Sequence, residues 1–279
     1  MISLRNLNFS YAYNEAILKD INLDITDGEY VAIIGANGSG KTTLIRHFNA
    51  LLLPASGDVL VDGLSTLKAK NLPEIRRRVG MIFQNPDNQI VGMTVEEDVA
   101  FGPGNLGLPS SEIKKRVDHA LTVVGLSEYK TRPPHTLSGG QKQLLALAGV
   151  LAMESKFIVL DEPTASLDPQ SASLVLSLLQ ELNQQGTAII HVTHHMDELD
   201  NAKRIIVIDQ GSIAADAPPC DIFSQVTWLK KLGLKPPKIS ELMWCLNQQV
   251  KIFPPGIFSV EQAGRAILSL LPANYFQGS

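Results

Sequence analysis

The sequence predicts an α/β fold built on a parallel sheet. Four short apolar blocks rich in branched residues lie at 31–34, 157–160, 188–190 and 205–208. A strand with one solvent-exposed face would alternate apolar and polar residues, so these continuous apolar runs indicate buried parallel strands. Helical patterns at 41–52 and 174–183 alternate with these blocks. The 279 residues, 44% of them apolar, are enough for one substantial core and a small appendage.

The first apolar block runs directly into a glycine-rich P-loop pattern, GANGSGKT, which opens the helical pattern starting near Lys41. Glycines allow backbone N–H groups to turn inward around a β-phosphate, and the helix N-terminus adds positive potential. Lys41 can then reach the β and γ phosphates, and Thr42 can hold Mg²⁺. The predicted nucleotide-binding residues are Gly35, Asn37, Gly38, Ser39, Gly40, Lys41, Thr42 and Thr43.

The segment from about 94 to 153 contains helix signals and no strong strand candidate. Thr94 and Glu97 fit a capping box, and Ser110 or Ser111 could cap the next helix. Further on, the string LSGGQ at 137–141 places Ser138 and Gln141 at capping-box spacing, ahead of an apolar helix whose free N–H groups could bind an anion. We expect a helical subdomain inserted into the sheet domain.

The second apolar block ends in two carboxylates, Asp161 and Glu162. An acidic residue at the carboxyl end of a strand beside a P-loop lies where the metal is held, so Asp161 is the expected Mg²⁺ partner through water. Glu162 would polarise the attacking water. The alternative is that the pair only ends the strand and forms surface salt bridges; the P-loop upstream favours the site.

After Gly211 the strand-like blocks stop, and pairs of prolines divide the tail into short pieces. Its leucines and isoleucines predict a small C-terminal domain over 220–273, with an uncertain boundary near Cys220. The last residues, NYFQGS at 274–279, look like an altered protease site left by cloning and are set aside.

The bulk properties exclude several classes of protein. A net charge of −4 and a pI near 5.9 give no electrostatic reason to expect nucleic-acid binding. Cys220 and Cys245 lack metal-ligand spacing and read as ordinary thiols of a reducing compartment. Neither a signal peptide nor an apolar run of about 20 residues is present, so we expect a cytosolic chain, or one peripheral to a membrane through a partner.

Together the P-loop, LSGGQ and the LDEP strand, in this order between about Ile2 and Pro219, resemble the ATP-binding cassette (ABC) family. The resemblance implies a P-loop NTPase core over 1–219 with N-terminal antiparallel β strands. It also implies a head-to-tail dimer with an identical or similar ABC ATPase subunit, in which Ser138, Gly139, Gly140 and Gln141 of one chain close over the γ-phosphate bound by the other. Many relatives have arginine where this chain has Leu144.

The resemblance assigns further roles. Tyr11, with Tyr13 as the alternative, matches the aromatic that stacks on adenine. Gln84 matches the glutamine that touches Mg²⁺ and the attacking water. Asp168 matches a residue of the loop that crosses the dimer. His194 matches the switch histidine that contacts the γ-phosphate. Lys41 and His194 would offset charge on the γ-phosphoryl group while Glu162 orients water. By sequence alone Tyr11, Gln84 and His194 would be ordinary residues, and His191 and His195 are expected to be so.

A narrower resemblance lies in FQNPDNQI at 83–90 and TVEEDVAFG at 94–102, which look like the ATPases of energy-coupling factor transporters. These import vitamins or cobalt and nickel ions. They imply a transmembrane coupling protein, a small membrane subunit that binds the substrate, and a place on the cytoplasmic face of the cell membrane. The alternatives are another ABC importer or exporter, or a non-transport ABC ATPase. DNA-repair cassettes would carry a heptad insertion or zinc cysteines, which this sequence lacks.

Overall fold

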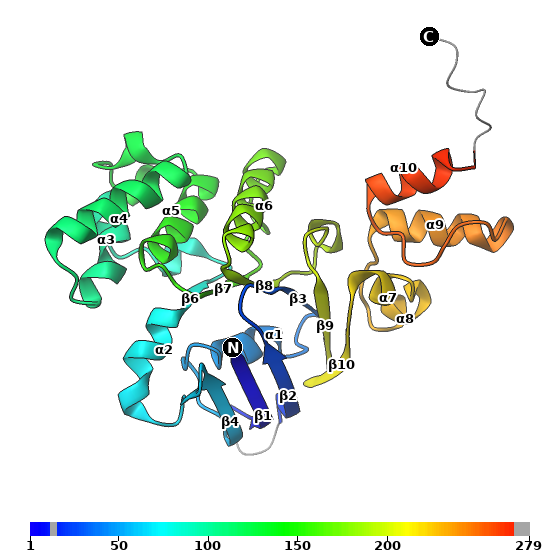
Figure 1. Ribbon diagram of the computed structural model, residues 1–279, viewed down its shortest axis with the longest axis horizontal. Coiled ribbons are helices and arrows are strands. Elements are labelled where there is room, and N and C mark those ends of the chain that lie inside the picture. The colour runs from blue at the N-terminus through cyan, green and yellow to red at the C-terminus, as the bar shows by residue number, and fades with distance from the viewer. Residues whose placement is uncertain (12–15, 271–279) are drawn as a thin grey trace, which may run out of the picture.

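A computed structural model describes residues 1–11 and 16–270. Its centre is a sheet in the order β10-β9-β3-β8-β7-β6, in which all neighbours are parallel except β9 and β10 (Figure 1). The strands are β3 (Tyr30–Ile34), β6 (Val79–Ile82), β7 (Phe157–Asp161), β8 (Ala188–Val192), β9 (Arg204–Asp209) and β10 (Ser212–Ala217). The four predicted apolar blocks lie in β3, β7, β8 and β9, which confirms the α/β fold class.

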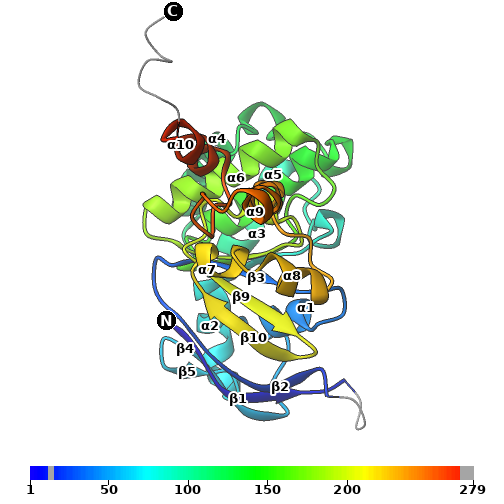
Figure 2. The same cartoon turned by 90° about the vertical axis from the view of Figure 1, so that its right-hand side faces the viewer.

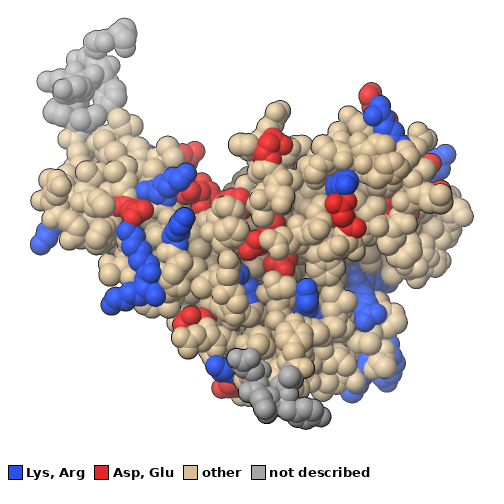
Figure 3. Space-filling model, turned by 180° about the vertical axis from the view of Figure 1, so that it is seen from behind, with Lys and Arg blue, Asp and Glu red and all other residues tan. Residues whose placement is uncertain are grey.

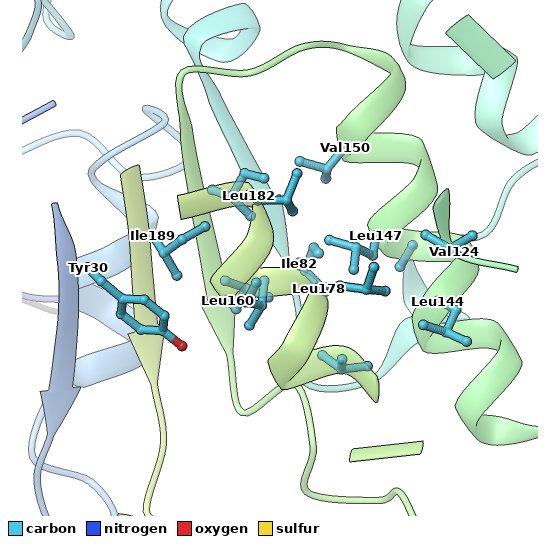
Figure 4. Packing of buried hydrophobic residues seen from close by; sticks show 14 of the residues in the cluster. Tyr30, Ile82, Val124, Leu144, Leu147, Val150, Leu160, Leu178, Leu182 and Ile189 are labelled. Carbon is cyan, nitrogen blue, oxygen red and sulfur yellow. The ribbon is translucent and has the colours of Figure 1, made fainter. Parts of the chain in front are cut away.

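Both faces of this sheet are covered, which explains why its strands read as continuous apolar runs. In β3, Tyr30, Ala32 and Ile34 belong to one buried cluster, and Val31 and Ile33 belong to another. Helices α5 (Gly139–Ala152) and α6 (Pro169–Gln184) pack on the first face, where Figure 4 shows side chains of both helices against the strands. The second cluster includes apolar residues of α1 (Lys41–Arg46) and of the N-terminal strands.

The N-terminal strands form a separate antiparallel sheet in the order β2-β1-β4-β5, as the resemblance implied. Its strands are β1 (Ile2–Phe9), β2 (Leu18–Ile25), β4 (Ser56–Val61) and β5 (Leu64–Ser65), and α2 (Leu72–Arg78) follows them. This sheet buries Leu4, Ile21 and Val59 against the central sheet, with α1 between the two sheets. The N-terminal sheet therefore supports the helix that follows the P-loop.

Only helices and turns occupy the described segment from 94 to 153, namely α3 (Val95–Asn105), α4 (Ser110–Val123), α5 and two 3-10 turns. The capping boxes predicted at Thr94 and Ser138 are confirmed. The predicted serine cap of α4 is wrong, because Pro109 takes the N-cap position and Ser110 is already helical. Backbone N–H groups of the first turn donate to the Pro109 carbonyl instead, at 2.9 and 3.0 Å.

The helix predicted at 41–52 is shorter than expected. Helix α1 spans Lys41–Arg46, and Ala50 adopts a left-handed φ of 57°. The N–H groups of Leu51 and Leu52 both return to the Arg46 carbonyl, which closes the helix end. Helix α6 contains the whole of the predicted helix at 174–183.

The C-terminal helices lie beyond the β9–β10 end of the central sheet, at the other end of the strand order from α3 and α4 (Figure 1), and Figure 2 views the molecule from this end. They are α7 (Pro219–Phe223), α8 (Val226–Lys231), α9 (Lys238–Gln249) and α10 (Val260–Leu268). Ile222, Phe223 and Leu229 pack into the main core, whereas Met243, Ile257 and Ala263 form a small cluster of their own. The domain boundary at 220 stays a prediction, and the suspected cloning remnant at 274–279 lies outside the described residues.

On the face shown in Figure 3, basic side chains are interspersed with acidic ones. Within residues 1–11 and 16–270, no helix is both long and apolar enough to cross a membrane.

Candidate functional site

The candidate site lies where parallel strands of the central sheet end. Strand β3 leads into the P-loop, β6 ends just before Gln84, β7 ends at Asp161, and β8 ends just before the segment that carries His194. The strands β3, β8, β7 and β6 are consecutive neighbours in the sheet, so their carboxyl ends lie along one edge. Residues more than 150 positions apart in the sequence therefore meet at this edge.

The P-loop holds a conformation that requires glycine at two positions, since Gly38 and Gly40 have φ values of 79° and 107°. Lys41 is buried with 7% exposure, and its ammonium donates to the carbonyls of Gly35 and Ala36 at 2.8 and 3.0 Å. Burial lowers the pKa of Lys41, and the nearby carboxylates of Glu162 and Asp161 oppose this shift. The ammonium is thus held over the loop that would receive the phosphates.

Thr42 and Asp161 form a pair suited to a hard cation. The Thr42 hydroxyl donates to Oδ2 of Asp161 at 2.9 Å, and Asp161 is only 6% exposed. Burial raises the pKa of Asp161, and the hydrogen bond from Thr42 offsets part of this rise. Among the described residues, no group of three or more His, Cys, Asp or Glu is placed to hold a metal ion. This donor set fits Mg²⁺, which takes few protein oxygens and completes its shell with water and substrate phosphate.

Glu162 is held between two of the three other predicted catalytic residues, Gln84 and His194. Its Oε2 accepts from Nε2 of Gln84 at 2.9 Å, and its Oε1 lies 2.9 Å from Nδ1 of His194. Its backbone has a left-handed φ of 50°, which is uncommon outside glycine and costs about 1–2 kcal/mol. Each carboxylate oxygen therefore has one side-chain partner that fixes its direction.

Most of these groups line one cavity of about 590 Å³, whereas Asp161 is not among its lining residues. Tyr11 is 59% exposed at the cavity, and its hydroxyl lies 3.2 Å from Oγ1 of Thr43. Its alternative, Tyr13, lies outside the described residues. The predicted residues found in the lining are Tyr11, Asn37, Gly38, Gly40, Lys41, Thr42, Thr43, Gln84, Glu162 and His194.

The signature residues and Asp168 lie apart from this cavity. Ser138 caps α5, where its hydroxyl accepts from the N–H of Gln141 at 3.3 Å. Asp168 caps α6 and is exposed, and hydrogen bonds from Ser171 lower its pKa. Neither lines the P-loop cavity of the same chain, within the residues that the structure describes. The nucleotide contacts predicted for these residues are therefore not part of the P-loop cavity of the same chain.

Sequence reasoning missed two members of the site region. Ile17 lines the cavity just before β2, and only its apolar character next to the aromatic segment hinted at this place. Lys142 follows the signature and forms an ion pair with Asp87 at 2.7 Å. The turn at Asp87 is capped by Asn85, whose side chain accepts from the Asp87 N–H at 3.0 Å. No spacing pattern in the sequence predicts the place of Ile17 in the cavity or the ion pair between Lys142 and Asp87.

Comparison with known proteins gives a consistent family. The ABC transporter family matches residues 18–165. The chain is 51% identical over 268 residues to the cobalt import ATP-binding protein CbiO of Syntrophus aciditrophicus, covering 96% of each chain. It is 49% identical over 267 residues to the energy-coupling factor transporter ATP-binding protein EcfA1 of Caldanaerobacter subterraneus subsp. tengcongensis, covering 94% of this chain and 96% of the relative.

Two solved structures are similar in fold and sequence. One is cbiO1 of Clostridium perfringens, described as part of the transporter complex cbiONQ, with a TM-score of 0.75 and 40% identity over 87% of this chain and 98% of that one. The other is a dimeric ATP-binding cassette in a post-hydrolysis state bound to ADP and Pi. Its TM-score is 0.70, with 31% identity over 78% of this chain and 98% of that one.

Proposed function

This chain belongs to the ABC transporter ATPase family, among the CbiO and EcfA type ATP-binding subunits, and we propose how its residues carry out the reaction. As a member it is an ATPase that powers transport. One observation carries the assignment of roles: Gln84 and His194 each contact one oxygen of Glu162 beside the P-loop cavity. A carboxylate fixed in this way can orient and polarise a water molecule for in-line attack.

The remaining cavity residues would bind the nucleotide. The P-loop N–H groups and Lys41 receive the phosphates, and Tyr11 offers its ring to adenine. Mg²⁺ would be held by Thr42, by Asp161 through water and by Gln84, and when bound it supplies positive charge that offsets the phosphate oxygens. The Lys41 ammonium has three N–H donors, of which two bond the carbonyls of Gly35 and Ala36, so a third donor is left for a phosphate oxygen.

The place of the signature supports a dimer. Because Ser138 to Gln141 and Asp168 lie outside the cavity, they would complete the site of a second ABC subunit, identical or similar, in a head-to-tail pair. The N-terminus of α5 offers free N–H groups to a γ-phosphate. Closing on ATP and reopening after hydrolysis would then follow from differential binding of the two nucleotide states.

An exposed apolar group next to the glutamine loop supports a membrane partner. Val91, Met93 and Phe101 are 61%, 83% and 55% exposed, between Gln84 and the end of α3. Such neighbouring apolar side chains mark interaction surfaces. We assign this surface to a transmembrane coupling protein, which would hold the chain at the cytoplasmic face of the membrane. The imported substrate, a vitamin or a cobalt or nickel ion, would be bound by a separate small membrane subunit.

The test replaces Glu162 with glutamine, which keeps the shape of the side chain but removes its charge. Glu162→Gln should bind ATP with unchanged affinity, trap a closed dimer on size-exclusion chromatography, and lower phosphate release by about 100-fold or more. Glu128→Gln, the same change in the exposed turn Ser127–Tyr129, is the control and should hydrolyse ATP normally. An unchanged hydrolysis rate in Glu162→Gln would remove this residue from its role.

A further inference from the structure

A carboxylate outside the cavity joins two of the loops that the proposed mechanism depends on. Glu198 lies in the 3-10 turn η5 (Met196–Glu198), just after the switch histidine, and its side chain is 16% exposed. Its Oε1 accepts a hydrogen bond from the Thr164 hydroxyl at 2.7 Å. Its Oε2 accepts one from the Thr193 hydroxyl at 3.3 Å. Each oxygen of Glu198 thus serves a different loop.

The first of these loops runs from the catalytic carboxylate to the residue proposed to cross the dimer. Thr164 is 5% exposed and lies between Glu162 and Asp168. Its carbonyl accepts from the Leu167 N–H at 3.0 Å, while the Glu162 carbonyl accepts from the Ala165 N–H at 3.3 Å. These short-range bonds make residues 162–167 a compact turn, with Thr164 within it.

The second loop carries the switch histidine. Thr193 is fully buried, and its hydroxyl, besides donating to Glu198, accepts from the backbone N–H of His195 at 2.9 Å. The two bonds of this hydroxyl therefore fix the backbone on both sides of His194. His194 also stacks against His195, with ring centroids 4.0 Å apart. Glu198 is thus joined, through the Thr193 hydroxyl, to the backbone beside His194.

A third group beneath Glu198 is held neutral and lacks a partner. His191 is fully buried, and burial lowers its pKa to about 4. The Tyr30 hydroxyl lies 3.3 Å from its Nδ1, so with that hydroxyl as donor the proton of His191 sits on Nε2. This nitrogen makes no hydrogen bond and lies 3.7 Å from Oε2 of Glu198, just beyond hydrogen-bond range. A small shift of Glu198 would give it a partner.

We propose that Glu198 is a positioning residue that couples the loop 162–168 to the switch segment 193–195. Movement of the loop at the dimer contact displaces Thr164, Glu198 follows, and Thr193 transfers the displacement to the backbone of His194. The unpartnered Nε2 of His191 provides a second resting position for the carboxylate. The proposal depends on the ATPase mechanism above, because it concerns the orientation of the same His194.

The test is a set of variants that break the link without touching the cavity. Glu198→Gln, Thr164→Val and Thr193→Val should each lower kcat by about tenfold, while the Kd for ATP stays within about twofold. In a double-mutant cycle, Thr164→Val should cause little further loss in the Glu198→Gln background. Asp197→Asn, in the same turn, is the matched control: its carboxylate accepts from the backbone N–H of Lys238 and should leave kcat unchanged.

The outcomes separate coupling from simple structural support. A residue that only stabilises the fold would lower the midpoint of thermal unfolding and the fraction of chains that bind ATP, but not kcat per bound site. Normal kcat in Glu198→Gln, or additive losses in the cycle, would overturn the proposal. If Glu198→Gln does not fold, the cycle between Thr164→Val and Thr193→Val decides the matter. A wild-type chain that hydrolyses no ATP in the dimer with its identical or similar ABC subunit would instead contradict the proposed function.

Discussion

Replacing Lys41 with methionine tests the P-loop assignment, because this change removes the charge and keeps most of the volume. Lys41 is 7% exposed and donates to two backbone carbonyls, and burial lowers its pKa. The variant loses both hydrogen bonds, but it also loses the cost of burying an ammonium group. We therefore expect the free chain to unfold near the temperature of the wild type.

Binding of ATP should respond far more strongly. A charge-assisted hydrogen bond to phosphate contributes about 1.5–3 kcal/mol, so the Kd of Lys41→Met should rise by about 100-fold. At an ATP concentration 100 times the wild-type Kd, ligand binding stabilises the wild type by about 2.7 kcal/mol and the variant by about 0.4 kcal/mol. For a chain of this size, the ATP-induced rise in Tm falls from about 5–10 °C to about 1 °C.

The assay is thermal unfolding with and without Mg-ATP, together with calorimetric titration of a non-hydrolysable analogue. Lys114→Met removes an exposed lysine on α4 and serves as the control, with the full ATP-induced shift. A Lys41→Met variant that keeps the wild-type shift would refute the reasoning, because the phosphates would then be bound elsewhere.

Three further substitutions probe the site and its surroundings. Gly35→Ala places a Cβ 2.3 Å from a backbone carbonyl oxygen of β9, so urea unfolding should show a loss of about 1–3 kcal/mol, and an unchanged midpoint would contradict the geometry. Asp87→Asn breaks the exposed ion pair with Lys142. Basal ATP hydrolysis should stay within about twofold of the wild type, while transport in reconstituted vesicles falls. Unaffected transport would count against the loop at 83–90 as a coupling element. Thr42→Val removes the hydrogen bond that opposes the raised pKa of Asp161. When folding raises the pKa of a carboxyl, the protein loses stability as the pH rises above the pKa of that carboxyl in the unfolded chain. The variant raises the pKa of Asp161 further, so its free energy of unfolding should fall more than that of the wild type between about pH 4 and pH 7.

The sequence identified the central strands because burial on both faces leaves a readable pattern. Val31 and Ile33 face one cluster while Ala32 and Ile34 face the other, so no position of β3 could be polar. The end of α1 could not be read in this way. It depends on the left-handed backbone of Ala50, and alanine is a good helix former that gives no sign of such a turn.

Some residues of the candidate site could be predicted from the sequence pattern, and others could not. Lys41, Asp161 and Glu162 follow apolar blocks in recognisable order, and their position at strand ends implied that they meet. Gln84 and His194 were assigned only through family resemblance, because a lone glutamine or histidine after a strand has no distinctive spacing. Glu198 was missed altogether. Its importance lies in contacts with Thr164 and Thr193, and side-chain contacts across a sheet edge leave no periodic trace.

The small cluster shared by α9 and α10 affects how the molecule melts. Met243, Ile257 and Ala263 are its only buried apolar members within the described residues, which is too little to sustain a cooperative fold. This pair of helices is therefore a local unit whose opening requires far less free energy than rupture of the central sheet. Helices α9 and α10 can therefore open locally while the P-loop keeps its structure. A change in the surroundings of these two helices would leave the ATP-binding site folded.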